Sequence, residues 1–313
     1  MRLGPGLLYE GRTLQGARPK LAEYCSATMA EFYSAVDRRH PDIAMPPETQ
    51  FFFEVAAEET SLDRQRIAEL LTESRMRDLE LDPEAVLALC PETGCDRRTL
   101  FDAILTAYTD KVGKPRAGEK SPMHIHHVPT LLEWYPDARI IYIMRDGRDA
   151  VHSIMGVPWT HDSIVRHCIS WIKVVRQAND LIQRYPQSIF KINYEALLAS
   201  PESVLKDVCA FIEAPFDPVM LMPGASAAVP EWEREWKSKA EGSIIPNNGG
   251  KWRARPTMDR ACMNVLMRDD LRAEGYAPDP VSIPLLAWTR LKTAPYHSSV
   301  RPLFRKIKNM ISH

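Results

Sequence analysis

The sequence predicts an α/β protein whose parallel strands carry helices on both faces. Residues 139–144, Arg-Ile-Ile-Tyr-Ile-Met, form a β-rich apolar run of the kind found in buried parallel strands. Residues 188–192, Ser-Ile-Phe-Lys-Ile, are predicted to form a second strand, and the segment from about 162 to 184 between the strands has one apolar helical stripe. This order favours parallel pairing, because the helix supplies the crossover connection between the strands.

Three further helices are expected before the first of these strands. Residues 62–76 and 98–112 have helical periodicity, and Pro129 suits the first position of a third helix. The short segment 115–119 leads into Lys120-Ser121-Pro122, where the proline favours an extended or turning backbone.

Two more helices are expected after the strands. The first strand ends at residues 145–149, and Asp149 is predicted to cap a helix that contains Ser153. Ser200-Pro201-Glu202 predicts a helix that runs to about residue 213, because serine caps helices and proline suits their first turn. Residues 223–256 are rich in Trp, Pro, Gly and charge, and they predict either a connector or a lid over a site.

The composition is that of a globular protein without an obvious charged partner. The 313 residues are 45% hydrophobic and 26% charged, and the net charge of −1 gives no reason to expect nucleic-acid binding. No apolar run approaches the roughly 20 residues of a membrane span. The N-terminus lacks the apolar region of a signal peptide, and the six cysteines lack zinc-site spacing, so we expect a cytoplasmic protein.

The chemistry is expected where the first strand ends, because open parallel sheets bind ligands at the carboxyl ends of their strands. Arg145 follows that strand, and Ser153 lies eight residues later in the next helix. A guanidinium fork and a hydroxyl near a helix N-terminus suit a phosphate group. The alternative is a surface ion pair of Arg145 with Asp146 or Asp149.

Residues 140–153 resemble the 3′-phosphate-binding segment of sulfotransferases that use 3′-phosphoadenosine 5′-phosphosulfate (PAPS). The resemblance is closest to the tyrosylprotein-sulfotransferase-like branch, which is also common in bacteria. Four further stretches agree in order and spacing: His40-Pro41-Asp42-Ile43 with Pro47-Glu48-Thr49, Glu119-Lys120-Ser121-Pro122, Asn193-Tyr194-Glu195-Ala196-Leu197-Leu198 with Ser200-Pro201, and Lys251-Trp252-Arg253.

The resemblance implies a P-loop-NTPase-like central parallel sheet flanked by helices. It covers residues 40–280 and divides the chain into an atypical N-terminal segment, 1–39, a sulfotransferase domain, 40–280, and a basic C-terminal tail, 281–313. After Asp279 the charged residues are all Lys or Arg, six in number. This tail is expected to be a solvated helix or arm, with contact to an anionic surface as the alternative.

The resemblance also implies how the nucleotide is held. Arg145 and Ser153 would hold the 3′-phosphate of the donor, PAPS, and Tyr194 and Lys251 would add nucleotide contacts. For Tyr194 the alternative is core packing with a satisfied hydroxyl.

Two further residues take catalytic roles by the same resemblance. Lys120 would neutralise the bridging oxygen as the sulfuryl group leaves, and Glu48 would take the proton of the acceptor hydroxyl. The alternatives are an exposed lysine at a strand end and a glutamate that caps the helix beginning near Thr49. Sulfuryl transfer, like phosphoryl transfer, leaves little covalent work to protein groups, so positioning and charge dominate.

The run His124-Ile125-His126-His127 raises the question of a metal site. A helix entrance would let only one or two rings converge, and no Cys or acidic partner has metal-like spacing nearby, so no metal is expected. His124 is an alternative general base. In the cytosolic branch of the family, a catalytic histidine stands at the position that Pro122 occupies here.

One stretch departs from the family. Members normally carry a strand and a loop reading like PRSGTT, which cradles the 5′-phosphosulfate, ahead of the HPD stretch. Residues 22–31 have no glycine, no arginine and no apolar strand in front, and Ser26-Ala27-Thr28-Met29 is only a faint echo of the loop.

The sequence therefore predicts a sulfotransferase that moves a sulfuryl group from PAPS to a hydroxyl, which peptide tyrosine, a sugar, a lipid or a small metabolite could supply. The alternative is a catalytically impaired nucleotide-binding or interaction protein on the same scaffold. An ATP-dependent kinase is disfavoured because no GxxxxGK[ST] motif occurs. The oligomeric state stays open.

Overall fold

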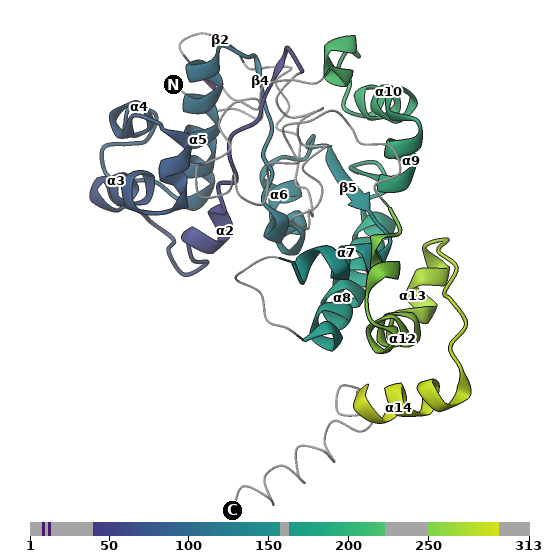
Figure 1. Cartoon of the computed structure of the whole chain (residues 1–313). Helices are drawn as coiled ribbons and strands as arrows, with labels where there is room; N and C mark the ends of the chain where they lie inside the picture. The colour runs from purple at the N-terminus through teal and green to yellow at the C-terminus, as the bar shows by residue number, and fades with distance from the viewer. Residues whose placement is uncertain (1–7, 10–11, 14–39, 157–162, 223–248, 294–313) are drawn as a thin grey trace, which may run out of the picture. The chain divides into compact units, whose positions relative to one another are not determined.

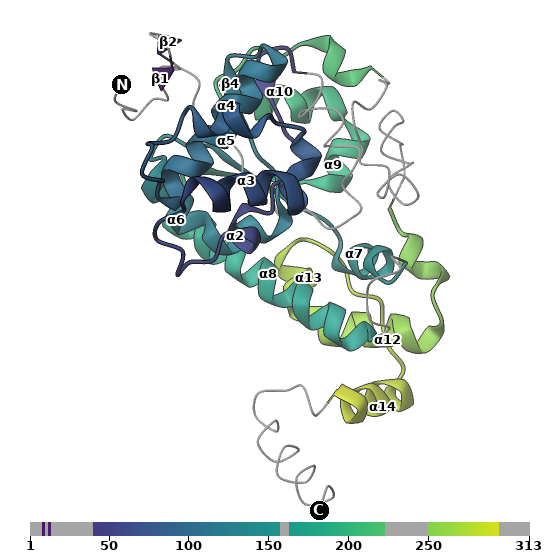
Figure 2. The same cartoon turned by 90° about the vertical axis from the view of Figure 1, so that its left-hand side faces the viewer.

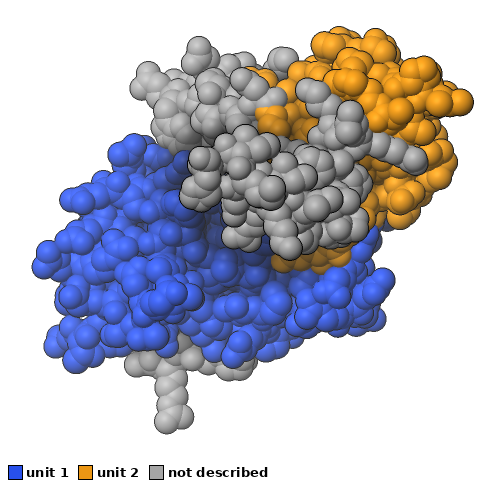
Figure 3. Space-filling model, turned by 90° about the horizontal axis from the view of Figure 1, so that it is seen from below, with its two compact units in different colours: residues 1–144, 178–247 blue, residues 145–177, 248–313 orange. Residues whose placement is uncertain are grey.

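The computed structural model describes residues 8–9, 12–13, 40–156, 163–222 and 249–293 (Figures 1 and 2). The chain separates into two compact units, which Figure 3 colours separately. Unit 1 consists of residues 1–144 and 178–247, and unit 2 of residues 145–177 and 248–313. The Ser26–Met29 stretch, most of the expected connector and the end of the basic tail lie outside the described residues.

The strands confirm the α/β class with parallel pairing. The described strands form one antiparallel pair, β1 (Leu8–Tyr9) with β2 (Arg12–Thr13), and two parallel pairs, β3 (Ile43–Ala44) with β4 (Arg116–Ala117) and β5 (Ile140–Met144) with β6 (Ile189–Asn193). Every residue of β5 is buried, as its continuous apolar sequence predicts for a strand covered on both faces.

The helices of unit 1 are α2 (Phe51–Glu54), α3 (Arg64–Glu73), η2 (Arg75–Leu79), α4 (Pro83–Leu87), α5 (Arg97–Val112), η3 (Pro122–His127), α6 (Val128–Trp134), α9 (Tyr194–Ala199), α10 (Pro201–Phe211) and η4 (Pro218–Leu221). The predicted helices at residues 62–76, 98–112, from Pro129 and from Pro201 to about 213 are confirmed to within a few residues, and α4, α9 and η4 were not predicted. α3, α4 and α5 lie side by side in Figures 1 and 2. Asp63 and Asp96 cap α3 and α5 by accepting hydrogen bonds from backbone N–H groups.

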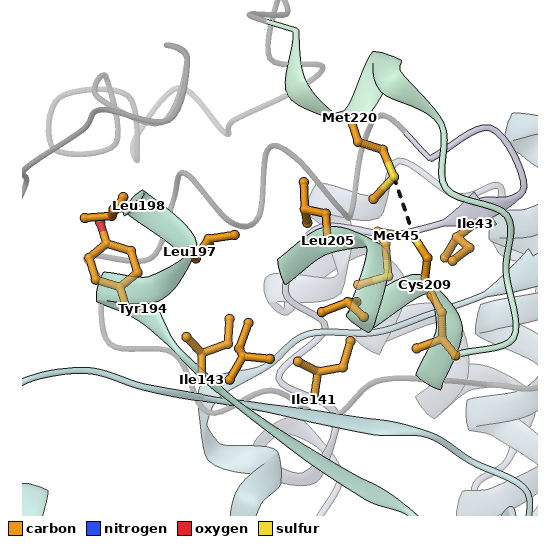
Figure 4. Packing of buried hydrophobic residues seen from close by; sticks show 13 residues of the cluster. Ile43, Met45, Ile141, Ile143, Tyr194, Leu197, Leu198, Leu205, Cys209 and Met220 are labelled. Carbon is orange, nitrogen blue, oxygen red and sulfur yellow. Dashed lines mark hydrogen bonds between the residues drawn. The ribbon is translucent and has the colours of Figure 1, made fainter. Parts of the chain in front are cut away.

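The two long strands and the helices after them share one core in unit 1. Figure 4 shows the buried side chains that fill the space between β5–β6 and α9–α10. Ile141 and Ile143 of β5 are at most 3% exposed, and Leu205 of α10 is fully buried. Ile43 of β3 belongs to the same cluster. This packing holds the ends of the strands in fixed positions.

Unit 2 contains α7 (Gly147–Ile154), η6 (Lys251–Ala254), α12 (Thr257–Leu266), α13 (Arg268–Ala273) and α14 (Ile283–Thr293), and α8 (Ile164–Arg184) has residues in both units. The predicted start of α7 was wrong. Asp146, not Asp149, caps the helix, and its carboxylate accepts a hydrogen bond from the N–H of Arg148. At the first residue of the helix, Gly147, a Cβ atom would lie 2.6 Å from the ring of Trp171, so this position needs a glycine.

None of the helices in the part of the chain that the structure describes combines the length and the apolar character needed to cross a bilayer.

Candidate active site

The parallel pairing of β3 and β4 brings Glu48 and Lys120 together. Ala44 is in register with Ala117, so both chains leave the pair at the same edge, and each residue follows shortly after its strand. The Oε1 atom of Glu48 accepts a hydrogen bond from Nζ of Lys120, and its Oε2 atom accepts one from Gln50 Nε2 at 2.7 Å. The Lys120 side chain is only 4% exposed, so the alternative of an exposed strand-end lysine is wrong.

Glu119 fixes the segment that carries Glu48. Its carboxylate accepts hydrogen bonds from the N–H of Thr49 at 3.2 Å, from the Thr49 hydroxyl at 2.7 Å and from the Ser121 hydroxyl at 2.6 Å. Its second oxygen lies 2.6 Å from Nδ1 of His124. The neighbours of both Glu48 and Lys120 in the chain therefore converge on one buried carboxylate.

The surroundings of Glu119 keep it ionised. Burial alone would raise the pKa of this carboxyl group, but the charge and the hydrogen bond of His124, together with those of Ser121 and Thr49, hold its pKa below the usual range. Removal of one of these partners would leave the buried charge less well compensated, which is destabilising. Sequence reasoning gave Glu119 no role of its own, although its place directly before Lys120 was a signal.

The backbone after Glu48 is held in a conformation that favours glycine. Gln50 has φ 50° and ψ 30°, the left-handed region, although it is not a glycine. Its N–H donates to the Ser121 hydroxyl at 2.9 Å, which offsets part of the cost. Gln50 is the N-cap of α2, which begins at Phe51, so Glu48 lies ahead of the helix and outside its first turn.

The three histidines of η3 have different environments. His124 is 1% exposed and packs edge-to-face on Phe52, with ring centroids 5.0 Å apart. His127 stacks on the same ring at 4.2 Å, and burial together with the charges of His124, Arg97 and His126 lowers its pKa to about 4. The His126 side chain is exposed. No cluster of three or more metal-ligating side chains occurs among the described residues.

Unit 2 carries three of the predicted nucleotide ligands. Arg145 directly follows β5 and is 5% exposed, and Ser153 is half-buried in α7. Lys251 is exposed at the start of η6.

Asp146 and Asp149, the two aspartates near Arg145 in the sequence, contact a second arginine and backbone N–H groups, respectively. Asp146 holds Arg148 through a two-pronged contact, with its Oδ2 at 2.7 Å from Nη2 and its Oδ1 at 3.0 Å from Nε. The Asp149 carboxylate accepts hydrogen bonds from the N–H groups of Gly250 at 2.5 Å and of Trp252 at 3.0 Å. The backbone on both sides of Lys251 is therefore tied to the first turn of α7.

Arg148 of α7 lies between the predicted ligands Arg145 and Ser153 in the sequence and contacts the same segments. Its guanidinium lies 4.2 Å from the ring centroid of the fully buried Trp252 and donates to Asn264 Oδ1 and to the carbonyl oxygen of Ala277, each at 3.0 Å. Sequence reasoning treated Arg148 only as part of a motif. Its burial with Trp252 shows that it holds α7, η6 and α12 together.

Positive charge gathers around His152 of α7. Burial lowers the pKa of this imidazole, and the charges of Arg255, Arg145 and Lys251 lower it further against the opposing effect of Asp149. The predicted residues Arg145 and Lys251 therefore act on the same point in unit 2. Such a group of cations suits an anion.

Tyr194, the fourth predicted nucleotide ligand, is fully buried in unit 1. It begins α9 directly after β6 and belongs to the hydrophobic cluster of Figure 4. Its contact with a nucleotide stays a prediction.

A family model described as the sulfotransferase family matches residues 21–218. A Caenorhabditis elegans protein provisionally named protein-tyrosine sulfotransferase is 27% identical over 139 residues, which are 41% of this chain and 54% of that protein. The Drosophila melanogaster protein-tyrosine sulfotransferase is 23% identical over 141 residues, 42% of this chain and 28% of that protein. The chain thus spans about half, or less, of the length of these relatives.

Solved structures give the same fold. A sulfotransferase domain from the curacin biosynthetic pathway superimposes with a TM-score of 0.59 at 17% identity, covering 83% of this chain and 99% of that domain. The sulfotransferase domain of the Synechococcus PCC 7002 olefin synthase gives a TM-score of 0.54 at 19% identity, covering 76% of this chain and 88% of that domain.

Proposed function

This chain belongs to the sulfotransferase family, and we propose that it transfers a sulfuryl group from PAPS to a hydroxyl acceptor. The observation that carries the proposal is the contact between the nearly buried ammonium group of Lys120 and the carboxylate of Glu48 at the shared edge of β3 and β4. A base and a cation held side by side are what hydroxyl activation and leaving-group stabilisation require.

In the proposed reaction, the acceptor hydroxyl gives its proton to Glu48 as its oxygen forms a bond to sulfur. The bond between sulfur and the bridging phosphate oxygen breaks, and adenosine 3′,5′-bisphosphate leaves. Lys120 stabilises the negative charge on that oxygen. Until the donor binds, the carboxylate of Glu48 compensates the charge of Lys120. Without this partner, the buried ammonium group of Lys120 would destabilise the fold.

The donor nucleotide is proposed to use unit 2. Arg145 and Ser153 would hold the 3′-phosphate, and Lys251 would add a further contact. Support comes from the positive charges of Arg145, Lys251 and Arg255, which lower the pKa of His152. The hydrogen bonds from the backbone N–H groups on both sides of Lys251 to Asp149 add to it.

Among acceptors, we favour a tyrosine side chain within a peptide. The names of the matched relatives in Caenorhabditis elegans and Drosophila melanogaster support this class. Sugars, lipids and small metabolites are the other classes to test. We also propose that the protein works in the cytoplasm.

A catalytically impaired nucleotide-binding protein is the second candidate function. The observation that favours it is the sequence of residues 22–31, which lacks the glycine and arginine of the PRSGTT-type loop. Such a protein would bind the bisphosphate without transferring sulfate.

Turnover of labelled PAPS against a panel of tyrosine peptides, sugars, lipids and small phenols tests the proposal. Glu48→Gln is expected to reduce turnover by about 10²–10⁴-fold, the loss typical of a missing general base, with bisphosphate affinity nearly unchanged. Glu58→Gln, an exposed glutamate after α2, is the matched control and should stay active. Full activity of Glu48→Gln with an inactive His124→Ala variant would assign the base to His124 instead.

A further inference from the structure

Cys90 and Cys95 lie at the two ends of a tight turn in unit 1. Their sulfur atoms are 3.4 Å apart, with Cys95 Sγ donating to Cys90 Sγ. Both thiols are free, and the residues are 7% and 5% exposed. An S–S bond is about 2.0 Å long, so the sulfurs need to approach by only roughly 1.4 Å to become bonded.

The turn between the two cysteines is built to keep them close. The N–H of Gly94 donates to the carbonyl oxygen of Pro91 at 3.0 Å, which closes the turn. Gly94 has φ 94°, and a Cβ there would lie 2.3 Å from the carbonyl oxygen of Leu62, so only glycine fits. Leu62 and Cys95 exchange backbone hydrogen bonds of 2.8 and 2.9 Å, which fix the second cysteine.

From this geometry we propose that Cys90 and Cys95 are a redox site that closes to a disulfide with a small disulfide oxidant such as oxidised glutathione. The proposal is independent of the sulfotransferase reaction. No part of the candidate active site is needed for it.

The reaction proceeds by two exchanges. The Cys90 thiolate attacks one sulfur of glutathione disulfide, forms a mixed disulfide and releases one glutathione thiolate. Cys95 then loses its proton and attacks the Cys90 sulfur, releasing the second glutathione. The two thiol protons pass to the two glutathione thiolates, so the protein loses two hydrogens and one glutathione disulfide becomes two glutathiones.

Cys90 is the better nucleophile of the two. The hydrogen bond from Cys95 lowers the pKa of Cys90 against the effect of burial, and the charge of Arg64 acts in the same direction. The same hydrogen bond, with burial, raises the pKa of Cys95. The residues of the turn, 91–93, are exposed, so local opening there admits the oxidant.

The disulfide would join two helices next to the candidate active site in unit 1. Cys90 follows α4, and Cys95 precedes Asp96, the cap of α5. Arg97, in the first turn of α5, donates to the carbonyl oxygen of Val55 at 3.0 Å and lies over the ring of Phe52 in α2. Oxidation would therefore restrict the segment that packs against α2.

The test is a redox titration of the full chain in glutathione buffers, with free thiols trapped by alkylation and peptides mapped by mass spectrometry. A Cys25→Ala background removes the cysteine outside the described residues. We expect a peptide pair joined at Cys90 and Cys95, two hydrogens lighter than the dithiol. Cys90→Ala and Cys95→Ala should each abolish it, and the matched control Cys209→Ala, a buried thiol of α10, should not.

The same titration in urea measures how much the folded structure favours the disulfide between Cys90 and Cys95. We expect the disulfide to be at least about tenfold more favourable in the folded chain, which corresponds to about 30 mV in reduction potential. Equal formation in urea, pairing with another cysteine, or free thiols at both positions in buffers that oxidise dithiothreitol would each overturn the proposal. These outcomes are all measured on protein that retains both Cys90 and Cys95, so they remain decisive even if a variant fails to fold.

Discussion

Glu119 carries an ionised carboxylate inside unit 1, and this makes it a source of pH dependence. Its pKa in the folded protein lies below the ordinary value of 4.5. The folded state therefore binds this proton less readily than the unfolded state, so the stability that Glu119 contributes is present above the ordinary pKa and is lost as pH falls through the folded value.

We expect the free energy of unfolding of the parent to fall more steeply than that of Glu119→Gln as the pH is lowered from about 6 to about 3.5, because only the parent loses this contribution. Urea denaturation at several pH values measures the difference. Glu133→Gln, at an exposed position, is the control and should follow the parent. Parallel curves for parent and Glu119→Gln would show that folding does not lower the pKa of Glu119.

Substitution of Arg145 tests the proposed binding of the 3′-phosphate. Arg145→Ala should weaken binding of adenosine 3′,5′-bisphosphate by about 1.5–3 kcal/mol, the range for a hydrogen bond to a charged group. Isothermal titration calorimetry measures the affinity. Arg166→Ala, an exposed arginine of α8, is the matched control. Unchanged affinity of Arg145→Ala would contradict the 3′-phosphate assignment.

At the scale of the element, α7 depends on the absence of a side chain at its first residue. A Cβ on Gly147 would lie 2.6–2.9 Å from three atoms of the Trp171 ring. We expect Gly147→Ala to destabilise the protein by about 1–3 kcal/mol, the usual cost of overpacking. Chemical denaturation measures this. Gly156→Ala, whose Cβ would meet only the Ser153 carbonyl oxygen at 3.3 Å, should cost less.

The sequence pattern predicted the two long strands well and the start of α7 poorly. β5 and β6 lie within a residue of their expected bounds. For β5 the reason is that full burial demands continuous apolar sequence, whereas β6 is only partly buried and contains the exposed Lys191. The start of α7 was misplaced because two aspartates are possible caps, and in the structure Asp146 caps the helix while Asp149 accepts from backbone N–H groups of residues 250 and 252. A contact between residues far apart in the sequence leaves no local signal.

The same limit applies to the candidate active site. Glu48 and Lys120 were predicted separately by resemblance, and the register of β3 and β4 shows that they meet. The contacts of Glu119 with Thr49 and of Asp149 with Trp252 were not predicted, since these partners are about 70 and 100 residues away in the chain.

At the scale of the whole molecule, the departure of residues 22–31 from the family pattern leads to a prediction about activity. Loss of one anion-stabilising donor costs about 10²–10³ in rate, and residues 22–31 lack the glycine and arginine of the loop that supplies such donors in the family. We expect the chain to bind the bisphosphate, which should raise its melting temperature, but to transfer sulfate very slowly. Replacing residues 22–31 with an apolar strand and a PRSGTT-type loop should restore turnover by orders of magnitude.

Thermal shift with the bisphosphate and turnover of labelled PAPS together check this expectation. Rapid turnover by the unmodified chain would contradict it and would assign the phosphosulfate cradle to Ser26, Thr28 or another segment. A grafted chain that folds and still fails to transfer sulfate would favour the nucleotide-binding alternative.

The short pairing of β3 with β4 has a consequence for insertions and deletions. Only three residues separate Ala44 from Glu48, and two separate Ala117 from Lys120. Removing one residue from either stretch would displace a charge by about 3.3 Å along the chain, enough to separate the pair. The exposed turn at residues 56–58 lies outside both stretches, so added or lost residues there leave the register intact. Length variation is therefore expected at that turn and not at the strand ends.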